Sequence, residues 1–376
     1  MSKQKVVICQ DLKAELQSFL DSLDYDKLFV LTDTNTVGKC FPLVKEVPAI
    51  QSARLIVVEA TDLHKDLESL STIWRHLSNE GASRHSVLLN LGGGMVTDMG
   101  GFAGATFKRG IRTINVPTTL MASVDAAVGG KTGINFNGLK NEIGAFYPPL
   151  CVFIDCGFLR TLDRDNVLSG YAEMIKHGLI SSMETYTSVM LYDIDTMNYG
   201  FLNRLVAQSV AVKEEVVEKD PKEQGIRKAL NFGHTIGHAY ESLSFKKGKP
   251  LLHGHAVAAG IISELFLSHK VCDFPMNKLS QVVYYIKSYY PPFLFDCKDY
   301  DALYELMTHD KKNEGGVINF TLLSQVLFGQ ASEHDTMNLQ VLAQLNIHQH
   351  RIDFRLCIKE VTTSRTNNDI YVDMMG

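Results

Sequence analysis

Residues 89–104 read LNLGGGMVTDMGGFAG, and this stretch sets the architecture of the first half of the chain. The apolar run SVLLNL at 86–91 is typical of a buried strand, and the small residues after the glycines predict a tightly packed helix. The three glycines therefore form a strand-to-helix turn. Glycine permits positive φ and close approach of a ligand, and a helix start offers N–H groups to a phosphate. An ordinary tight turn with close helix packing fits the same residues, because the spacing is not G-x-G-x-x-G.

Five further apolar runs of the same kind flank this turn within the first 155 residues. They are KVVIC (5–9), KLFVLTD (27–33), ARLIVVEA (53–60), RTINVPT (112–118) and LCVFID (150–155). Helical periodicity occurs between some of them, at 12–23 and 67–81. This alternation predicts a mostly parallel sheet covered by helices, which binds ligands at the carboxyl ends of its strands.

After Asp155 the pattern changes to long stretches with helical periodicity and hardly a strand among them. We therefore expect an α/β fold with an N-terminal, Rossmann-like, mostly parallel sheet domain at 1–157 and a mostly α-helical domain at 158–347. The polar tail at 348–376 is assigned no role. Residues 310–326, DKKNEGGVINFTLLSQV, predict a charged loop followed by a strand or hairpin.

Composition narrows the partners and the compartment. The net charge is −5 with no basic block, so neither nucleic acid nor an anionic membrane surface is expected as a partner. No signal peptide and no apolar run of about 18 residues occurs. Seven cysteines are scattered and never spaced as C-x-x-C, which fits free thiols in a reducing compartment. We expect a cytoplasmic protein.

Histidines are concentrated in the second half. His234 and His238 lie four residues apart in LNFGHTIGHAYE, so on a helix both rings share one face. His253 and His255 follow in LLHGHAVAAG, and Glu173 lies upstream in SGYAEMIKHG together with Lys176 and His177. Each histidine alone fits a solvated or core position. Two histidines with a carboxylate, however, form the ligand pattern of catalytic zinc.

Basic and amide side chains gather on glycine-bounded segments. Lys131 follows Gly129 and Gly130, and Lys140 and Asn141 follow the loop at 137–138. Arg109 precedes them in FKRG, and Arg227 and Asn231 precede the histidine helix in RKALN. Such groups suit a phosphate, which needs positive charge and several donors. Ordinary solvated loops have the same composition.

These motifs together resemble the 3-dehydroquinate synthase family. The matching segments, in family order, are GGGMVTD, FKRG, VPTTLMASVDAAVGGKTGIN, GLKNEIGAFYPP, GYAEMIKHGLI, RKALNFGHTIGHAYE, HGHAVAAG and DKKNEGG, within residues 26–325. The resemblance implies a homodimeric lyase of the shikimate pathway of aromatic amino acid biosynthesis. It implies conversion of 3-deoxy-D-arabino-heptulosonate 7-phosphate to 3-dehydroquinate and phosphate, with transient oxidation by NAD. The metal it implies is Zn²⁺, with Co²⁺ as a substitute.

The same resemblance implies roles for individual residues. The metal ligands are Glu173, His234 and His253. The NAD contacts are Asp33, Asn35, Asp62, Lys65, Gly93, Gly94, Asp98, Thr118 and Thr119. The catalytic residues are Asp125, Lys131, Lys176, Lys213 and His238. The remaining substrate contacts are Arg109 from the neighbouring subunit, Lys140, Asn141, Arg227, Asn231 and Lys312.

The chain departs from the family pattern at two places. TDLHKDL replaces GExxK, which leaves Asp62 where the family has glutamate, and HGH replaces HGE, which puts His255 beside the ligand His253. Three alternatives stay open: another sugar phosphate cyclase of valiolone or inosose type, a glycerol-dehydrogenase-like oxidoreductase, and an inactive relative that acts as a binding subunit. Arg227 with Asn231 favours a substrate with a carboxylate, and the GGKT and GLKN loops disfavour the oxidoreductase.

Overall fold

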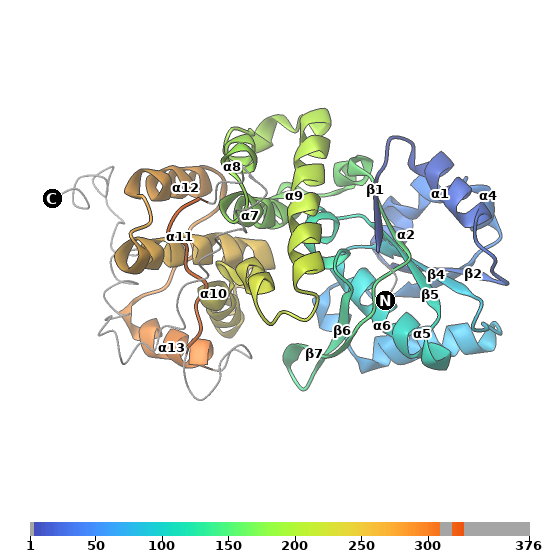
Figure 1. Cartoon of the computed structure of the whole chain (residues 1–376). Helices are drawn as coiled ribbons and strands as arrows, with labels where there is room; N and C mark the ends of the chain where they lie inside the picture. Colours follow the sequence, from blue (N-terminus) through green and yellow to red (C-terminus); the bar gives the residue numbers. More distant parts are fainter. Residues whose placement is uncertain (1–3, 309–317, 327–376) are drawn as a thin grey trace. The chain divides into compact units, whose positions relative to one another are not determined.

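The computed structural model describes residues 4–308 and 318–326, and the chain divides into two compact units (Figure 1). The first comprises Met1–Gly170 and Thr196–Glu215, and the second comprises Tyr171–Asp195 and Val216–Gly376. The chain passes between them three times, within α7 (Arg164–Leu179), η5 (Ile194–Thr196) and α9 (Tyr199–Lys219). The domain boundary expected after residue 157 stays a prediction. Lys312 and the tail at 348–376 lie outside the described residues.

The first unit is built on a six-stranded sheet of order β1-β8-β5-β4-β2-β3, in which every pair of neighbouring strands is parallel. The strands are β1 (Lys5–Ile8), β2 (Leu28–Asp33), β3 (Arg54–Val58), β4 (Val87–Gly92), β5 (Arg112–Pro117) and β8 (Cys151–Ile154). The six apolar runs correspond to these six strands. The predicted parallel sheet is therefore confirmed.

The sheet is buried on both faces, which explains its continuous apolar runs. Along β2, Val30 packs in the cluster that holds α1 (Leu12–Asp21), whereas Phe29 and Leu31 pack in the cluster that holds α5 (Leu67–Asn79). Asp11 caps α1 by accepting the backbone N–H of Ala14 at 3.1 Å, and Asp66 caps α5 by accepting that of Ser69 at 2.8 Å. Caps and apolar periodicity thus agree on both helices.

The glycine turn leads from β4 into α6 (Gly94–Thr106), as predicted. None of its three glycines has positive φ. Close packing is what requires them. A Cβ on Gly92 would lie 2.6 Å from Val96 Cβ, and one on Gly100 in the helix would lie 2.0 Å from the Asn90 side-chain oxygen.

A two-stranded antiparallel sheet replaces the loops expected after residue 130. Its strands are β6 (Lys131–Phe136) and β7 (Leu139–Phe146). Glycines interrupt the alternation of side chains that would have indicated strands: Gly133 faces Gly144 in the ladder, and a Cβ on Gly144 would lie 2.1 Å from the Thr132 carbonyl oxygen. Most of β7 is exposed, so no apolar run indicated it either.

Short helices complete the first unit. They are α2 (Thr36–Lys39), α3 (Phe41–Val44), α4 (Pro48–Gln51), η1 (Asp62–His64), η2 (Phe107–Arg109), η3 (Ala122–Ala126) and η4 (Cys156–Thr161). One of them, η3, is a turn of π-helix that contains Asp125. Single π turns occur often at functional sites.

The second unit is helical, as predicted. Besides the ends of α7 and α9 it contains α8 (Met183–Met190), η5 (Ile194–Thr196, at its edge), η6 (Ile226–Asn231), α10 (His234–Lys246), α11 (His253–Cys272), α12 (Met276–Tyr289), η7 (Cys297–Asp299) and α13 (Tyr300–Thr308). The strand expected within 310–326 is absent from the described part, residues 318–326, where Leu322 makes a single bridge. Across the described residues, no helix has both the length and the apolar character to cross a lipid bilayer.

The helices α10 and α11 touch through their backbones. Gly233 adopts φ 78° just before α10. A Cβ on Gly260 of α11 would lie 2.1 Å from the Gly233 carbonyl oxygen and 2.7 Å from the Gly237 nitrogen. Both neighbours are backbone atoms, so they have no side-chain rotamer by which to yield. The packing of these two helices therefore requires glycine at 260.

We expect Gly260→Ala to lower the free energy of unfolding by about 3 kcal/mol, at the upper end for an overpacked core. Urea denaturation of the full chain measures this. Gly38→Ala is the matched control, because a Cβ at Gly38 meets nothing within 4 Å and alanine favours the helical conformation of α2. Equal stability of the two variants would contradict the packing argument.

Candidate functional site

Three histidines converge in the helical unit. His234 begins α10, His238 lies one turn later, and His253 begins α11. Their ring centroids are 5.3 Å apart for His234 and His238, 5.4 Å for His234 and His253, and 5.7 Å for His238 and His253. One nitrogen of each ring lies within 4.8 Å of the others. The i, i+4 spacing and the start of the next helix together produce this cluster.

Glu173 on α7 extends the cluster with a carboxylate that is fully buried. Its Oε1 lies 3.4 Å from His234 Nε2 and 3.8 Å from His253 Nε2. Ligand bonds of roughly 2.0–2.1 Å at tetrahedral angles place two zinc ligands about 3.3 Å apart. The donor set and its spacing therefore fit a zinc-type ion, and Glu173, His234 and His253 are the residues suited to hold it.

Hydrogen bonds orient both imidazoles of this set. His234 Nδ1 lies 3.1 Å from the Phe232 carbonyl oxygen, and His253 Nδ1 lies 3.2 Å from Glu241 Oε2. Both partners accept, so Nδ1 carries the proton and Nε2 keeps the lone pair that a metal needs. Glu241 was not among the residues predicted from sequence, although it ends the motif LNFGHTIGHAYE.

Two further residues of this region have distinct surroundings. Lys176, one turn after Glu173 on α7, is buried and forms an ion pair with that carboxylate. His255 packs edge-on against Tyr290, with ring centroids 5.5 Å apart. The structure thus brings Lys176 to the predicted metal ligands and gives His255 an aromatic neighbour.

The segment before α10 holds Arg227 and Asn231 in η6. Arg227 is buried; its backbone N–H donates to the Asp220 carboxylate at 3.1 Å and its Nη1 donates to the Pro221 carbonyl at 2.8 Å. Asn231 Nδ2 donates to Glu223 Oε1 at 2.7 Å. The turn at 220–223 therefore fixes both predicted substrate residues.

In the sheet unit, predicted cofactor residues lie at the carboxyl ends of three adjacent strands. Asp33 ends β2, Gly93 follows β4 and Thr118 follows β5. The hydroxyl of Thr118 is buried without a hydrogen-bond partner, and no side chain caps the first turn of α6. Uncapped N–H groups beside an unsatisfied hydroxyl fit the pyrophosphate of a dinucleotide. Asp33 accepts the N–H groups of Asn35 and Thr36 at 2.8 and 2.9 Å.

A buried ion pair connects this region to the β6–β7 hairpin. Lys65 Nζ lies 2.5 Å from Asp98 Oδ2 and also donates to the Asn141 side chain. Lys140 pairs with Asp62 at 3.3 Å. The structure therefore brings together residues predicted for the cofactor and residues predicted for the phosphate. Burial raises the pKa of Asp98 above its ordinary value, and the charge of Lys65 opposes that increase.

The remaining predicted residues of the sheet unit differ in exposure. Lys213 of α9 is buried and donates to the backbone carbonyl of Asp125 at 2.5 Å and to its carboxylate. Thr119 accepts the Ala122 N–H at 3.1 Å at the start of the π turn. Arg109 and Lys131 are exposed.

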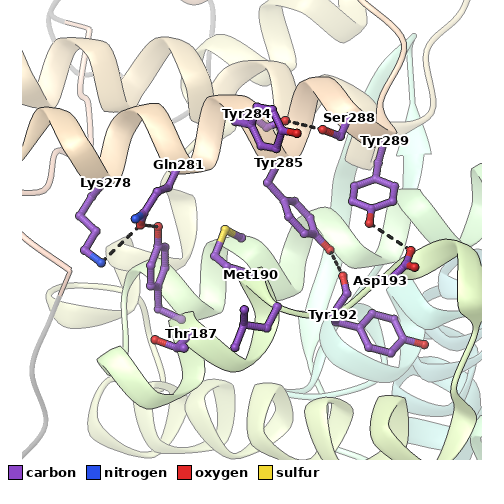
Figure 2. A pocket seen from close by; sticks show the side chains of 12 residues that line it. Thr187, Met190, Tyr192, Asp193, Lys278, Gln281, Tyr284, Tyr285, Ser288 and Tyr289 are labelled. Atoms are coloured by element: carbon purple, nitrogen blue, oxygen red, sulfur yellow. Dashed lines mark hydrogen bonds between the residues drawn. The ribbon is translucent and has the colours of Figure 1, made fainter.

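A separate pocket of about 550 Å³ lies between α8 and α12 (Figure 2). Five tyrosines line it: Tyr186, Tyr192, Tyr284, Tyr285 and Tyr289. The hydroxyls of Tyr285 and Tyr289 donate to the Tyr192 carbonyl at 2.8 Å and to Asp193 at 3.1 Å. Burial raises the pKa of Tyr186 to about 12. Such tyrosines stay protonated at neutral pH, so the histidine cluster is the better candidate for chemistry.

Solved structures show the class of fold. A 2-epi-5-epi-valiolone synthase from Streptomyces hygroscopicus subsp. jinggangensis, solved with NAD+ and Zn2+, aligns with a TM-score of 0.78 at 23% identity, over 94% of this chain and 97% of the other. A 2-deoxy-scyllo-inosose synthase, solved with carbaglucose-6-phosphate, NAD+ and Co2+, gives 0.74 at 22% identity, over 95% of each chain. The chain therefore shares the fold of these two synthases.

Sequence comparisons identify the family within this class. The 3-dehydroquinate synthase N-terminal model matches residues 55–169, and the corresponding C-terminal model matches 170–313. A 3-dehydroquinate synthase of Parabacteroides distasonis is 79% identical over 326 residues, 87% of this chain and 92% of the relative. That of Oceanobacillus iheyensis is 35% identical over 329 residues, 86% and 90% of the two chains. The chain belongs to the 3-dehydroquinate synthase family.

We expect Lys65→Met to lower the free energy of unfolding by about 3 kcal/mol at pH 7.5, the lower end for a broken buried pair, because Asp98 keeps 18% exposure. The pKa of Asp98 is higher in the folded than in the unfolded chain, so its ionisation destabilises the fold as pH rises between these two pKa values. Without Lys65 the pKa of folded Asp98 rises further, and the carboxyl is protonated over more of the range. The loss of unfolding free energy caused by Lys65→Met should therefore be smaller at pH 5. Urea denaturation at both pH values measures it.

Lys140→Met is the matched control, because the Lys140 and Asp62 side chains are about half exposed, at 47% and 48%. Its effect should stay below about 1 kcal/mol at either pH. A Lys65→Met loss that is the same at pH 5 and pH 7.5 would contradict the electrostatic account of this pair.

Proposed function

We propose that this chain converts 3-deoxy-D-arabino-heptulosonate 7-phosphate to 3-dehydroquinate and inorganic phosphate, as a lyase of the shikimate pathway. The observation that carries this proposal is the 79% identity, over 87% of the chain, to a relative named 3-dehydroquinate synthase. The cluster of two oriented histidines and a buried carboxylate supports it, since catalytic zinc sites use such ligands.

Glu173, His234 and His253 would hold Zn²⁺, which Co²⁺ can replace in such sites. A bound ion of this kind supplies a Lewis acid to a substrate oxygen. The protonated Nδ1 atoms, fixed by Phe232 and Glu241, keep both Nε2 atoms available to it. His238, whose ring lies 5.3 Å from that of His234, would contact the substrate beside the metal.

The carboxyl edge of the sheet would bind NAD, which supplies a reversible hydride acceptor. Gly93 and Gly94 begin α6 without a capping side chain, and Thr118 offers a buried hydroxyl. Asp33, Asn35 and Thr119 lie at or beside the same strand ends. Asp62, Lys65 and Asp98 form the remaining predicted cofactor contacts, already connected through the β6–β7 hairpin.

The substrate contacts are assigned by the family resemblance. Asp125, Lys176 and Lys213 would contact the ring hydroxyls, and a carboxylate holds the ammonium of each lysine, Glu173 for Lys176 and Asp125 for Lys213. Arg227 would bind the substrate carboxylate with its planar guanidinium. The phosphate would take the remaining basic and amide groups: Lys131, Lys140, Asn141 and Asn231, together with Lys312 outside the described residues.

We further propose a cytoplasmic homodimer in which Arg109 reaches the phosphate of the neighbouring subunit. Arg109 is exposed at the end of FKRG, and the backbone of this loop is unusual, with positive φ at Lys108 (49°), Arg109 (67°) and Gly110 (120°). Strained backbone of this kind is often retained at functional sites. The cytoplasmic location rests on the free cysteines predicted from their spacing.

Phosphate release tests the reaction directly. Chelator-treated full-length protein is mixed with 3-deoxy-D-arabino-heptulosonate 7-phosphate, and NAD and Zn²⁺ are added singly and together. We expect release only with both, with formation of 3-dehydroquinate and no net NADH, because the oxidation is reversed within the cycle. Inorganic phosphate, NADH absorbance and product are measured in parallel.

The same assay with hexose and heptose phosphates that lack a carboxylate is the control. Release from those compounds alone would assign the chain to another cyclase reaction. Failure with every substrate, despite bound NAD and Zn²⁺, would support an inactive binding subunit instead.

We expect Arg227→Lys to lower kcat/KM about 10- to 150-fold, the value of a charge-assisted hydrogen bond of roughly 1.5–3 kcal/mol. Lysine keeps the charge but loses the two-pronged geometry, so KM should account for most of the change. The affinity for NAD, measured by fluorescence titration, should stay as in the wild type because its contacts are assigned elsewhere. An unchanged kcat/KM would defeat the carboxylate assignment.

A further inference from the structure

A second buried carboxylate of the helical unit, Glu264 on α11, contacts the start of α10. Glu264 is fully buried. Its Oε2 accepts the backbone N–H of Gly233 at 2.7 Å, and its Oε1 accepts that of Ile236 at 3.0 Å. Each oxygen therefore binds one backbone donor, and the two donors flank His234.

The first turn of a helix leaves its N–H groups without intrahelical acceptors and carries the positive end of the helix dipole. A side chain at the N-cap usually satisfies these groups. In α10 the N-cap is Gly233, which has no side chain and whose φ of 78° is unfavourable for residues that have one. Glu264 supplies the missing acceptors from the neighbouring helix, and the N–H groups and dipole offset the cost of burying its charge.

No side chain at the N-cap position of α10 can replace Glu264 as the acceptor. A Cβ on Gly233 would lie 2.6 Å from Ile261 Cγ1 and 3.2 Å from the Ile261 nitrogen. Serine, threonine or aspartate at 233 would therefore clash with α11 as well as strain the backbone. The N-cap residue therefore cannot supply the acceptor, and Glu264 supplies it from the neighbouring helix.

The proposed metal ligand His234 lies between the two backbone donors, Gly233 and Ile236. His234 is the first residue of α10, and its Nε2 lies 3.4 Å from Glu173 Oε1. The contact of its Nδ1 with the Phe232 carbonyl sets the ring rotation, but that carbonyl belongs to the segment that enters the helix. The bonds to Glu264 fix the backbone on both sides of His234, and thereby the position of its ring.

We propose that Glu264 is a positioning residue for the metal site: it holds the first turn of α10 so that His234 is preorganised to bind the ion. The proposal rests on the proposed function, because it assumes that His234 is a ligand. It assigns Glu264 no contact with metal, cofactor or substrate. Its effect is exerted through two backbone N–H groups.

The test measures Zn²⁺ affinity of the full chain by competition with a chromophoric chelator, without substrate or turnover. Glu264→Gln keeps the side-chain volume but replaces one acceptor by an NH₂ group, which opposes a backbone N–H. We expect its Kd for Zn²⁺ to rise about 10- to 100-fold, the range for lost support of a ligand. Glu264→Asp, which keeps the charge but is shorter, should give an intermediate Kd.

Tyr285→Phe is the matched control, since it removes a buried hydrogen bond of the same unit, from Tyr285 to the Tyr192 carbonyl at 2.8 Å, away from α10. It should lower the melting temperature of the metal-free chain and leave the Kd for Zn²⁺ unchanged. This separates positioning from general loss of stability.

Three outcomes overturn the proposal. Wild-type Kd in folded Glu264→Gln, or in Glu264→Asp if the glutamine variant fails to fold, limits Glu264 to a structural role. A Kd that rises equally in Tyr285→Phe attributes the effect to stability. If His234→Ala binds Zn²⁺ with the wild-type Kd, the metal assignment is wrong and this proposal is wrong with it. If His234→Ala weakens Zn²⁺ binding but Glu264→Gln has the wild-type Kd, only the positioning role is refuted.

Discussion

The backbone contact between α10 and α11 is the constraint on which the candidate metal site depends. Helices usually pack through side chains at interaxial distances of 8–10 Å. Here Gly237 and Gly260 remove the side chains at the contact, and a Cβ on Gly260 would come within 2.1 Å of the Gly233 carbonyl oxygen. The start of α10 therefore lies against the second turn of α11, and Gly237 lies against Ala256 and Val257, so the two helices run antiparallel at this contact. This packing brings His253, the first residue of α11, over the first turns of α10, where its ring lies 5.4 Å from that of His234.

Three carboxylates of the two units, Glu264, Asp98 and Glu173, have neighbours of different kinds that compensate their charge. Backbone N–H groups stabilise the Glu264 carboxylate and Lys65 stabilises that of Asp98, so groups of the protein itself compensate both charges. Glu173 faces one ammonium, from Lys176, and imidazole nitrogens whose lone pairs point toward it. Lone pairs beside a carboxylate repel each other unless a cation lies between them. This electrostatic difference distinguishes Glu173, which is suited to bind a metal, from Glu264, which is suited to support the helix.

The parts of the structure that were predictable from sequence are those in which local pattern and tertiary environment agree. The six parallel strands were evident because burial on both faces makes each an uninterrupted apolar run. The β6–β7 hairpin was missed because glycines face each other in its ladder and β7 is exposed. Long-range pairs were beyond reach: Lys65 meets Asn141 from 76 positions away, and Glu264 caps a helix 31 positions before it. The motifs identified candidate residues, but only the packing of helices and strands decides their partners.

Substrate choice cannot reside in the fold. Enzymes that make valiolone and inosose rings share it at TM-scores of 0.78 and 0.74 with only 22–23% identity. Choice has to lie in a few side chains, because the same scaffold serves several ring-closing reactions. Arg227, which we propose binds the substrate carboxylate, is suited to this role. The turn at Asp220 and Pro221 holds it by its backbone N–H and by Nη1, so little rotamer entropy would be lost on binding. A neutral sugar would leave that buried charge without an anionic partner from the substrate, which is a penalty on the wrong ligand and a gain for the right one.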